Sequence, residues 1–281
     1  MRVEQLGEGT PTVAVVAGIH GDEPGGVSAI NRLVEASPPV DRPVLLVIVN
    51  ERALEAGVRY VDTDLNRAFP GDPTADAYES NLAYDLAELL AGCTVLSLHS
   101  TKSHPEPFMV VDRVDPLVER LATALPVESV VDTGDFIQGR LFAAVRTIEV
   151  ECGLQGSDEA AAAALRLTLA YLRAMDVLAP ETAADLGAEF GVDPIEEDTA
   201  AETPVYRLIK QIPKTTDFEY EVYVDNFEHI EYGTTFASSE LGDVVADESF
   251  YPVLLSADGY ESMLGYVAQR QRIIQPPTQQ Q

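Results

Sequence analysis

Residues 13–26 read VAVVAGIHGDEPGG, and this stretch decides the fold that the sequence predicts. Its first six residues form a continuous apolar run, rich in β-branched valine, that ends in a glycine. Such a run is typical of a strand that is buried on both faces of a sheet. His20 and Glu23 follow directly. In an open α/β sheet, ligand sites collect at the carboxyl ends of strands, so both residues are candidates for a functional site.

Similar apolar runs recur further along the chain, at residues 44–49, 94–98, 108–111 and 146–150. Helical patterns separate them, at about residues 25–36, 75–91, 115–125 and 158–178. Strands that alternate with helices predict an α/β fold, with a mostly parallel mixed sheet flanked by helices.

The composition changes after residue 179. Residues 180–204 carry many acids, alanines and prolines, so we expect an acidic linker or a loosely attached surface helix. From residue 205 onward, short strand-like pieces are separated by turn residues. The sequence therefore predicts an α/β domain over residues 1–179, a linker, and a smaller β-rich C-terminal domain over residues 205–275.

Charge is the most unusual feature of the composition, because the 281 residues carry a net charge of −29. Self-repulsion at this level destabilises a compact chain in dilute salt, and high ionic strength screens it. The acids are spread along the chain, so we interpret the charge as a halophilic adaptation to a salty cytoplasm. An acidic protein that seeks a cationic partner is the alternative.

The same composition argues against two classes of partner. No basic stripe is present that would neutralise nucleic-acid phosphates, and no apolar stretch approaches the ~20 residues that span a bilayer. The N-terminus also lacks an apolar signal core. We expect a cytoplasmic protein that binds neither nucleic acid nor membrane, with homo-oligomer formation left open.

A metal site is the chemistry that the strand-end residues favour. Zinc accepts imidazole nitrogen and carboxylate oxygen, and catalytic sites commonly use three protein ligands plus water. His20 and Glu23 supply two ligands, and His99 follows the run at 94–98, where a third could meet them. His104 is the alternative third ligand. The structural alternative for the first pair is a surface turn with an incidental histidine.

Two further segments contain charged residues that could lie near the predicted metal site. Residues 59–69 read RYVDTDLNRAF, and near a metal the arginines at 59 and 67 would bind an anionic substrate through their planar forks; a solvated loop with internal ion pairs is the alternative. Residues 147–153 read TIEVECG, which places Glu149 and Glu151 on one side of a strand. Glu151, at the strand end, could exchange protons with a water at the metal, whereas Glu149 is expected to pair with an arginine.

In order and spacing, the segments GIHGDEPGG, RYVDTDLNRAF, SLHSTKS and EVECG resemble the succinylglutamate desuccinylase/aspartoacylase family, a branch of the zinc carboxypeptidase-like hydrolases. The resemblance spans residues 18–153. It implies a catalytic α/β domain followed by a small β-rich domain, with one zinc ion per chain. The implied reaction is hydrolysis of the amide bond of a small, carboxylate-bearing N-acyl amino acid, with ester cleavage left open.

Position by position, the resemblance also implies roles for individual residues. The zinc ligands would be His20, Glu23 and His99, and Glu151 would be the general acid/base. Arg59 would polarise the scissile acyl oxygen. The residues that would bind substrate are Asn66, Arg67, Arg140 (with Arg146 as its rival) and Tyr260 in the C-terminal region.

One departure from the family pattern is Ser97, which stands two residues before the third ligand where relatives often have an acid. A hydroxyl brings no charge to the imidazole, so zinc affinity would be lower. Two other functions remain open from the sequence: a zinc carboxypeptidase that acts on peptides, and a non-catalytic binding protein that retains the fold.

Overall fold

The computed structural model describes residues 1–136, 138–192, 202–215 and 217–276. In these residues ten strands form one sheet, in the order β1-β3-β2-β4-β7-β5-β6-β8-β13-β12. The strands that precede residue 180 are β1 (Arg2–Leu6), β2 (Val13–Ala17), β3 (Val44–Ile48), β4 (Thr94–Thr101), β5 (Phe108–Val111), β6 (Val130–Asp132) and β7 (Thr147–Leu154). Those that follow it in this sheet are β8 (Thr203–Pro213), β12 (Tyr251–Val253) and β13 (Met263–Ile274).

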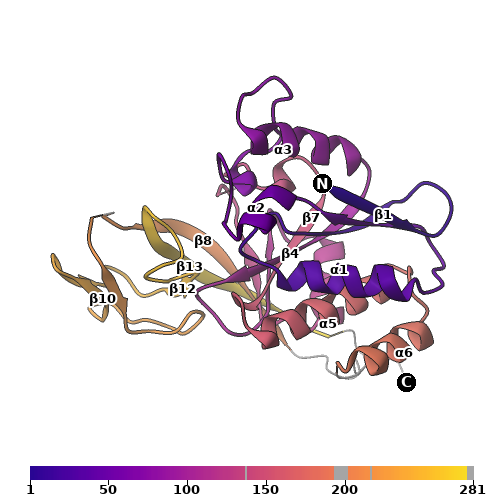
Figure 1. The fold of residues 1–281 in the computed structure, drawn as a ribbon. Coiled ribbons are helices and arrows are strands. Elements are labelled where there is room, and N and C mark those ends of the chain that lie inside the picture. The colour runs from indigo at the N-terminus through magenta and orange to yellow at the C-terminus, as the bar shows by residue number, and fades with distance from the viewer. Residues whose placement is uncertain (137, 193–201, 216, 277–281) are drawn as a thin grey trace.

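Helices cover both faces of the sheet. In Figure 1, α1, α5 and α6 lie on one face and α3 lies on the other. The reason is the alternation of side chains along buried strands: Val13 and Val15 of β2 pack in the core with α1 and α5, whereas Ala14 and Val16 pack in the core with α3. The helices are α1 (Gly25–Ala36), α2 (Glu51–Ala56), α3 (Tyr78–Leu89), α4 (Pro116–Ala124), α5 (Asp158–Ala174) and α6 (Pro180–Phe190), with the 3-10 turns η1 (Leu65–Arg67) and η2 (Leu141–Ala143).

The pairing of the strands confirms the predicted fold class. β3, β2, β4 and β7 run parallel, as do β5, β6 and β8. Antiparallel pairs join β1 to β3, β5 to β7, and β13 to both β8 and β12, which makes the sheet mixed. Every apolar run expected to be a strand is one. β1 was not expected because four of its five residues are exposed, so no apolar run marks it.

The stretch predicted as a linker is in part a packed helix. α6 buries Ala183 and Leu186 in the same core as α5. Residues 180–190 therefore belong to the α/β layer, which corrects the expectation of a linker or loosely attached helix for this half. Residues 193–201 of the predicted linker lie outside the described residues.

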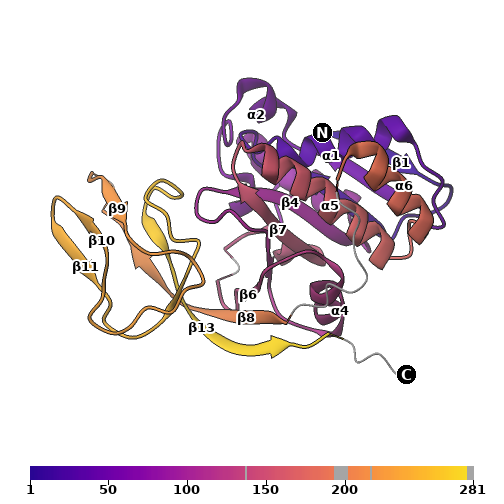
Figure 2. The ribbon, with the colours of Figure 1, turned by 90° about the horizontal axis from the view of Figure 1, so that it is seen from below.

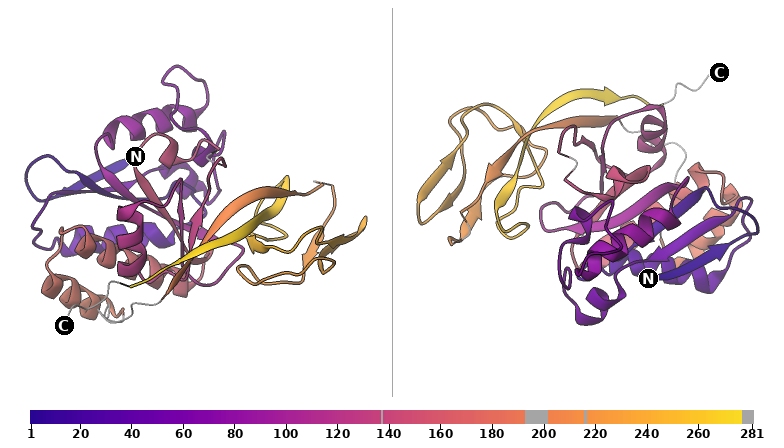
Figure 3. Two further views of the ribbon diagram at one scale, coloured as in Figure 1. Left: turned by 180° about the vertical axis from the view of Figure 1, so that it is seen from behind. Right: turned by 90° about the horizontal axis from the view of Figure 1, so that it is seen from above.

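The C-terminal region is rich in strands, and two of them continue the central sheet. β8 pairs with β6, and β13 pairs with β8, so the sheet runs past residue 205 without a break. A three-stranded sheet follows at the far end of these long strands, as Figures 2 and 3 show. Its strands are β9 (Tyr220–Val222), β10 (Thr235–Ser239) and β11 (Gly242–Val245). The division into separate domains stays a prediction.

None of the helices in the described ranges has both the length and the apolar character needed to cross a membrane.

Candidate active site

Three adjacent strands bring the predicted residues together. β2, β4 and β7 are parallel neighbours, so their carboxyl ends meet at one edge of the sheet. His20 and Glu23 follow β2, His99 lies in β4, and Glu151 is its direct partner in the register of β7. The expectation that these strand ends converge is thus confirmed.

His20, Glu23 and His99 form a compact buried group. Their potential ligand atoms all lie within 4.8 Å of one another. Glu23 Oε1 is 2.7 Å from His20 Nδ1, and Glu23 Oε2 is 3.2 Å from His99 Nδ1. Two imidazoles and one carboxylate are a donor set that catalytic zinc sites use. A zinc ion would also stabilise the negative charge of the carboxylate that is buried between the two imidazoles. The residues present therefore fit a zinc ion.

Backbone packing fixes the turn that carries the first two ligands. A Cβ atom at Gly21 would lie 2.1 Å from the backbone carbon of Ala53, so only glycine fits there. The Gly21 amide donates to the carbonyl of Arg59 across 3.1 Å. The turn after β2 is thereby tied both to α2 and to the arginine-bearing segment.

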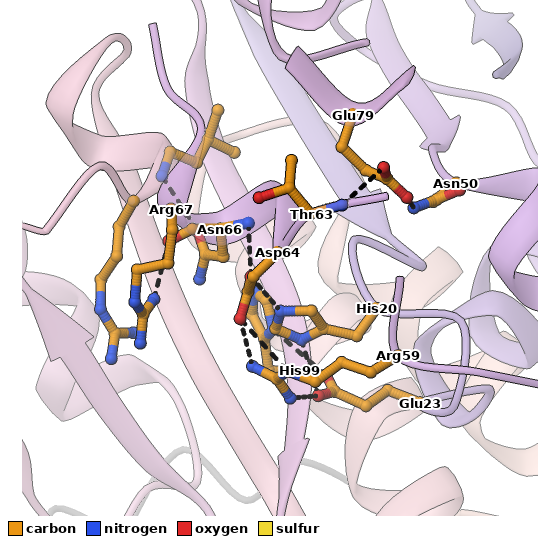
Figure 4. Close-up of polar contacts among 12 residues, drawn as sticks. His20, Glu23, Asn50, Arg59, Thr63, Asp64, Asn66, Arg67, Glu79 and His99 are labelled. Atoms are coloured by element: carbon orange, nitrogen blue, oxygen red, sulfur yellow. Dashed lines mark hydrogen bonds and ion pairs between the residues drawn. The ribbon is translucent and has the colours of Figure 1, made fainter. Parts of the chain in front are cut away.

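Asp64 is a site residue that the sequence analysis did not single out. Its Oδ1 lies 3.2 Å from His20 Nε2, and its Oδ2 accepts hydrogen bonds from Arg59 Nε and Nη2, both at 3.2 Å (Figure 4). Burial by itself would lower the pKa of His20, but the carboxylates of Glu23 and Asp64 outweigh it and raise that pKa to about 9. The position of Asp64 inside the RYVDTDLNRAF segment was the signal that could have revealed it.

The two histidines thus have different partners behind them. The second nitrogen of His20 faces the Asp64 carboxylate, whereas His99 Nε2 lies 3.1 Å from the Ser97 hydroxyl. A charged partner makes a metal-binding imidazole a better electron donor than a neutral one does. His99 therefore has a neutral hydroxyl behind it, whereas the charged partner, Asp64, lies behind His20.

Glu151 has the surroundings of a proton-transfer group. It is 9% exposed, and its Oε2 is a buried atom without a hydrogen-bond partner in the described part of the chain. Burial raises the pKa of this carboxyl above its ordinary value, and the charges of Glu23 and Glu149 add to the rise. A raised pKa makes a carboxyl a better proton acceptor, which suits a group that takes up a proton and then returns it.

Arg140 and Arg146, the two candidates for binding the substrate, have different surroundings. Arg140 lines the pocket and donates from Nη1 to Glu149 Oε2 across 2.7 Å, which confirms the expectation that Glu149 pairs with an arginine. Arg146 forms an ion pair with Asp115 and is not among the residues that line this pocket. Arg140 is thus the arginine placed to meet a ligand.

A pocket adjoins these groups. Its cationic lining consists of Arg59, Arg67, Arg140 and Lys102. Burial and the nearby charge of Arg140 lower the pKa of Arg67, because two guanidinium groups repel each other. A bound anion would relieve this repulsion.

Asn66 and Tyr260, two other polar residues of the predicted site, also line the pocket. Asn66 is buried, lines the pocket, and accepts a hydrogen bond from the Leu141 amide through Oδ1. Tyr260 reaches the pocket from the C-terminal region, and its enclosure raises its pKa to about 12. His104, the rival third ligand, instead lies 2.7 Å from Glu128 and outside the ligand group.

The mixed sheet and the helices on both of its faces define an α/β fold that is shared with solved succinylglutamate desuccinylase/aspartoacylase structures. Within that class, the chain belongs to the succinylglutamate desuccinylase/aspartoacylase family, whose catalytic-domain model matches residues 9–174.

Individual relatives agree with this assignment. The chain is 33% identical to an aspartoacylase of Xenopus tropicalis over 116 residues, which are 36% of this chain and 37% of the relative. It is 36% identical to an N-alpha-acetyl-L-2,4-diaminobutyric acid deacetylase of Halomonas elongata over 105 residues, or 35% of this chain and 30% of the relative. The chain thus spans about a third of the length of these curated relatives.

The likeness in structure is more extensive. The crystal structure of a succinylglutamate desuccinylase/aspartoacylase from Rhodobacter sphaeroides superposes with a TM-score of 0.71. The match covers 96% of this chain and 89% of that one at 18% sequence identity, which shows the shared fold.

Proposed function

We propose that this protein is a zinc-dependent deacylase that hydrolyses the amide bond of a small N-acyl amino acid bearing carboxylates. The observation that carries the proposal is the Glu151 carboxyl, which is buried beside the group of His20, Glu23 and His99 and whose Oε2 has no hydrogen-bond partner among the described residues. Family membership supports the same reaction class. A zinc ion held by the three ligands would supply Lewis-acid activation of water and of the acyl oxygen.

Glu151 performs the proton transfers. It takes a proton from the attacking water as the new carbon–oxygen bond forms, and it returns that proton to the amine nitrogen as the carbon–nitrogen bond breaks. The products are a carboxylic acid and a free amine. The raised pKa of Glu151 suits both steps, because a carboxyl with a higher pKa accepts a proton from water more readily.

Arg59 stabilises the negative charge that develops on the acyl oxygen. Its guanidinium lines the pocket, with Nη1 3.4 Å from Glu23 Oε1 and the other side of the fork held by Asp64. A cation fixed in this way needs little reorganisation when the oxyanion forms, and such preorganised groups lower the barrier most effectively.

Arg67, Arg140 and Asn66 hold the substrate. Arginine binds carboxylates through two parallel hydrogen bonds, and the repulsion between Arg67 and Arg140 favours an anion between them. Tyr260 closes the pocket from the C-terminal side. The names of the relatives specify different substrates, so an assay of several N-acyl amino acids is the way to identify the acyl group and the amine of the substrate.

The two other functions have weaker support. A carboxypeptidase needs an open cleft for a peptide, whereas Leu254, Ser256 and Tyr260 of the C-terminal region line this pocket. A binding protein without activity has no need of a buried carboxyl with a raised pKa beside a metal-binding group.

The test combines zinc content with hydrolysis of a panel of N-acyl amino acids, esters and short peptides in high salt. We expect stoichiometric zinc, turnover of an N-acyl amino acid, and loss of turnover with zinc retained in Glu151→Gln. Glu128→Gln is the matched control, because Glu128 pairs with His104 outside the pocket. Peptide cleavage alone would favour the carboxypeptidase, and folded protein that binds no zinc would refute the proposal.

A further inference from the structure

Glu79 is the most completely enclosed acid among the described residues, with an exposed fraction of 0%. It lies in the first turn of α3 and plays no part in the reaction described above. A carboxylate removed from water in this way is costly unless its oxygens accept strong hydrogen bonds. The partners of Glu79 therefore show what it does.

Three consecutive backbone amides converge on the Glu79 carboxylate. Its Oε1 accepts from the Val61 amide at 2.6 Å, and its Oε2 accepts from Asp62 and Thr63 at 3.0 and 3.2 Å. The Asn50 side chain adds a fourth hydrogen bond, from Nδ2 to Oε1 at 3.1 Å. Figure 4 shows Glu79 between Asn50 and the Thr63 amide, next to the segment that carries Asp64, Asn66 and Arg67.

The carboxylate is ionised at neutral pH. Burial alone would raise the pKa of Glu79, but the hydrogen bonds from Val61, Asp62, Asn50 and Thr63 outweigh burial and lower it. Each of the two oxygens accepts two hydrogen bonds. A glutamine at position 79 would put an NH2 donor in place of one oxygen, and that donor would face two N–H groups.

The backbone that Glu79 holds leads directly into the pocket. Arg59 lies two residues before the bound amides, and Asp64 follows them. Asp64 then caps the turn η1 by accepting from the Asn66 amide at 2.9 Å, and η1 ends at Arg67. A shift of residues 61–63 would move all of these side chains relative to the metal-binding group.

We propose that Glu79 is a positioning residue for the hydrolytic site, whose carboxylate fixes the backbone of residues 61–63 and thereby the directions of Arg59, Asp64, Asn66 and Arg67. This inference rests on the proposed deacylase function for its catalytic consequence. Its structural part, the clamp on three amides, stands independently of any activity. Neither Glu79 nor Asn50 touches the metal-binding group.

Glu79→Gln is the direct test, since it keeps the shape and removes the charge. We expect zinc content to stay at the wild-type value, kcat/KM to fall about tenfold or more, and exchange of the Val61, Asp62 and Thr63 amides with solvent to accelerate about tenfold or more, in line with the loss of charge-assisted hydrogen bonds. The matched control is Asp115→Asn, which removes one charge from a carboxylate that accepts from the amides of Leu117 and Val118 away from the pocket.

A second variant keeps the test decisive if Glu79→Gln does not fold. Asn50→Ser removes the side-chain donor to Glu79, yet serine can still cap α2 in place of asparagine. We expect the same kind of change at smaller size, about threefold in kcat/KM, with zinc retained. Values of kcat/KM and amide exchange within about twofold of wild type in the folded variants would overturn the proposal.

The readouts separate this inference from the function on which it rests. Wild-type protein that turns over nothing would count against the deacylase, and amide exchange would still report on the clamp. Rapid exchange of the three amides in the folded wild-type protein would overturn the clamp whatever the activity. The proposal would also be overturned if Asp115→Asn lowered kcat/KM as much as Glu79→Gln does. The loss of activity would then follow from the removal of a negative charge alone.

Discussion

Arg140 and Glu149 form an ion pair of 2.7 Å in the interior of the protein, with exposed fractions of 4% and 1%. Arg140 belongs to the loop before η2, and Glu149 lies in β7, two residues before the proposed base. The charge of Glu149 raises the pKa of Arg140 further above its ordinary value, against the effect of burial. One buried carboxylate therefore keeps a cation in place at the floor of the pocket.

Glu149→Gln should destabilise the protein by about 3 kcal/mol or more, because it leaves the buried Arg140 cation without its counter-charge. The measurement is the free energy of unfolding from urea titration. Arg146→Met provides the contrast: its pair with Asp115 is exposed, so its loss should cost about 1 kcal/mol or less. Equal effects of the two substitutions would contradict this distinction.

Removal of metal should abolish turnover and lower the melting temperature, and zinc should restore both. The physical reason is that Glu23, buried between His20 and His99, would lose the cation proposed to bind there. A ligand that binds only the folded state at about a thousand times its Kd contributes roughly 4 kcal/mol. His20→Gln should mimic chelation, whereas His104→Gln should keep zinc. Retention of activity after complete chelation would argue against zinc chemistry.

Two of the three lysines in the chain hold the same loop. Lys214 Nζ donates to the carbonyl oxygens of Ala257 and Tyr260 at 2.5 and 3.3 Å, and Lys102 Nζ donates to that of Asp258 at 3.4 Å. These bonds position the part of the C-terminal region that brings Tyr260 to the pocket. The third lysine, Lys210, pairs with acids on the surface.

Lys214→Met should therefore raise KM about fivefold or more without change in zinc content, because the loop loses two charge-assisted hydrogen bonds. Lys210→Met is the matched control and should leave KM within about twofold of wild type. Steady-state kinetics on the substrate found in the panel gives both values. A KM for Lys214→Met that is no higher than that of the control would show that the loop does not depend on Lys214.

Stability should increase with salt. At a net charge of −29, repulsion between acids is strong when the screening length is about 10 Å at 0.1 M salt and falls when it is about 3 Å at 1 M. Urea unfolding in 0.1 M and 2 M potassium chloride would measure this, since urea itself adds no charge. An unchanged urea midpoint would count against the interpretation of the charge as halophilic.

Local patterns predicted much of the fold and part of the site. Continuous apolar runs identified buried strands such as β3 and β5, because a strand covered on both faces must be apolar along its length. β1 was missed since its exposed side chains leave no such run. α6 was taken for a linker because the few residues that attach it to the core, among them Ala183 and Leu186, leave little apolar pattern in an acidic, alanine-rich stretch.

The candidate ligands were predictable because strand ends follow from sequence, and parallel strands place their ends together. Sequence alone thus determined the fold class and singled out His20, Glu23, His99 and Glu151 as candidates, and their roles stay predictions. The tertiary structure decided that Arg140 rather than Arg146 faces the pocket, and that Asp64 stands behind His20. It also decided that Glu79 holds a loop 16 to 18 residues away. The physical reason is that a hydrogen bond depends on the position of two groups in space, and a charged side chain between distant segments leaves no periodic pattern in the sequence.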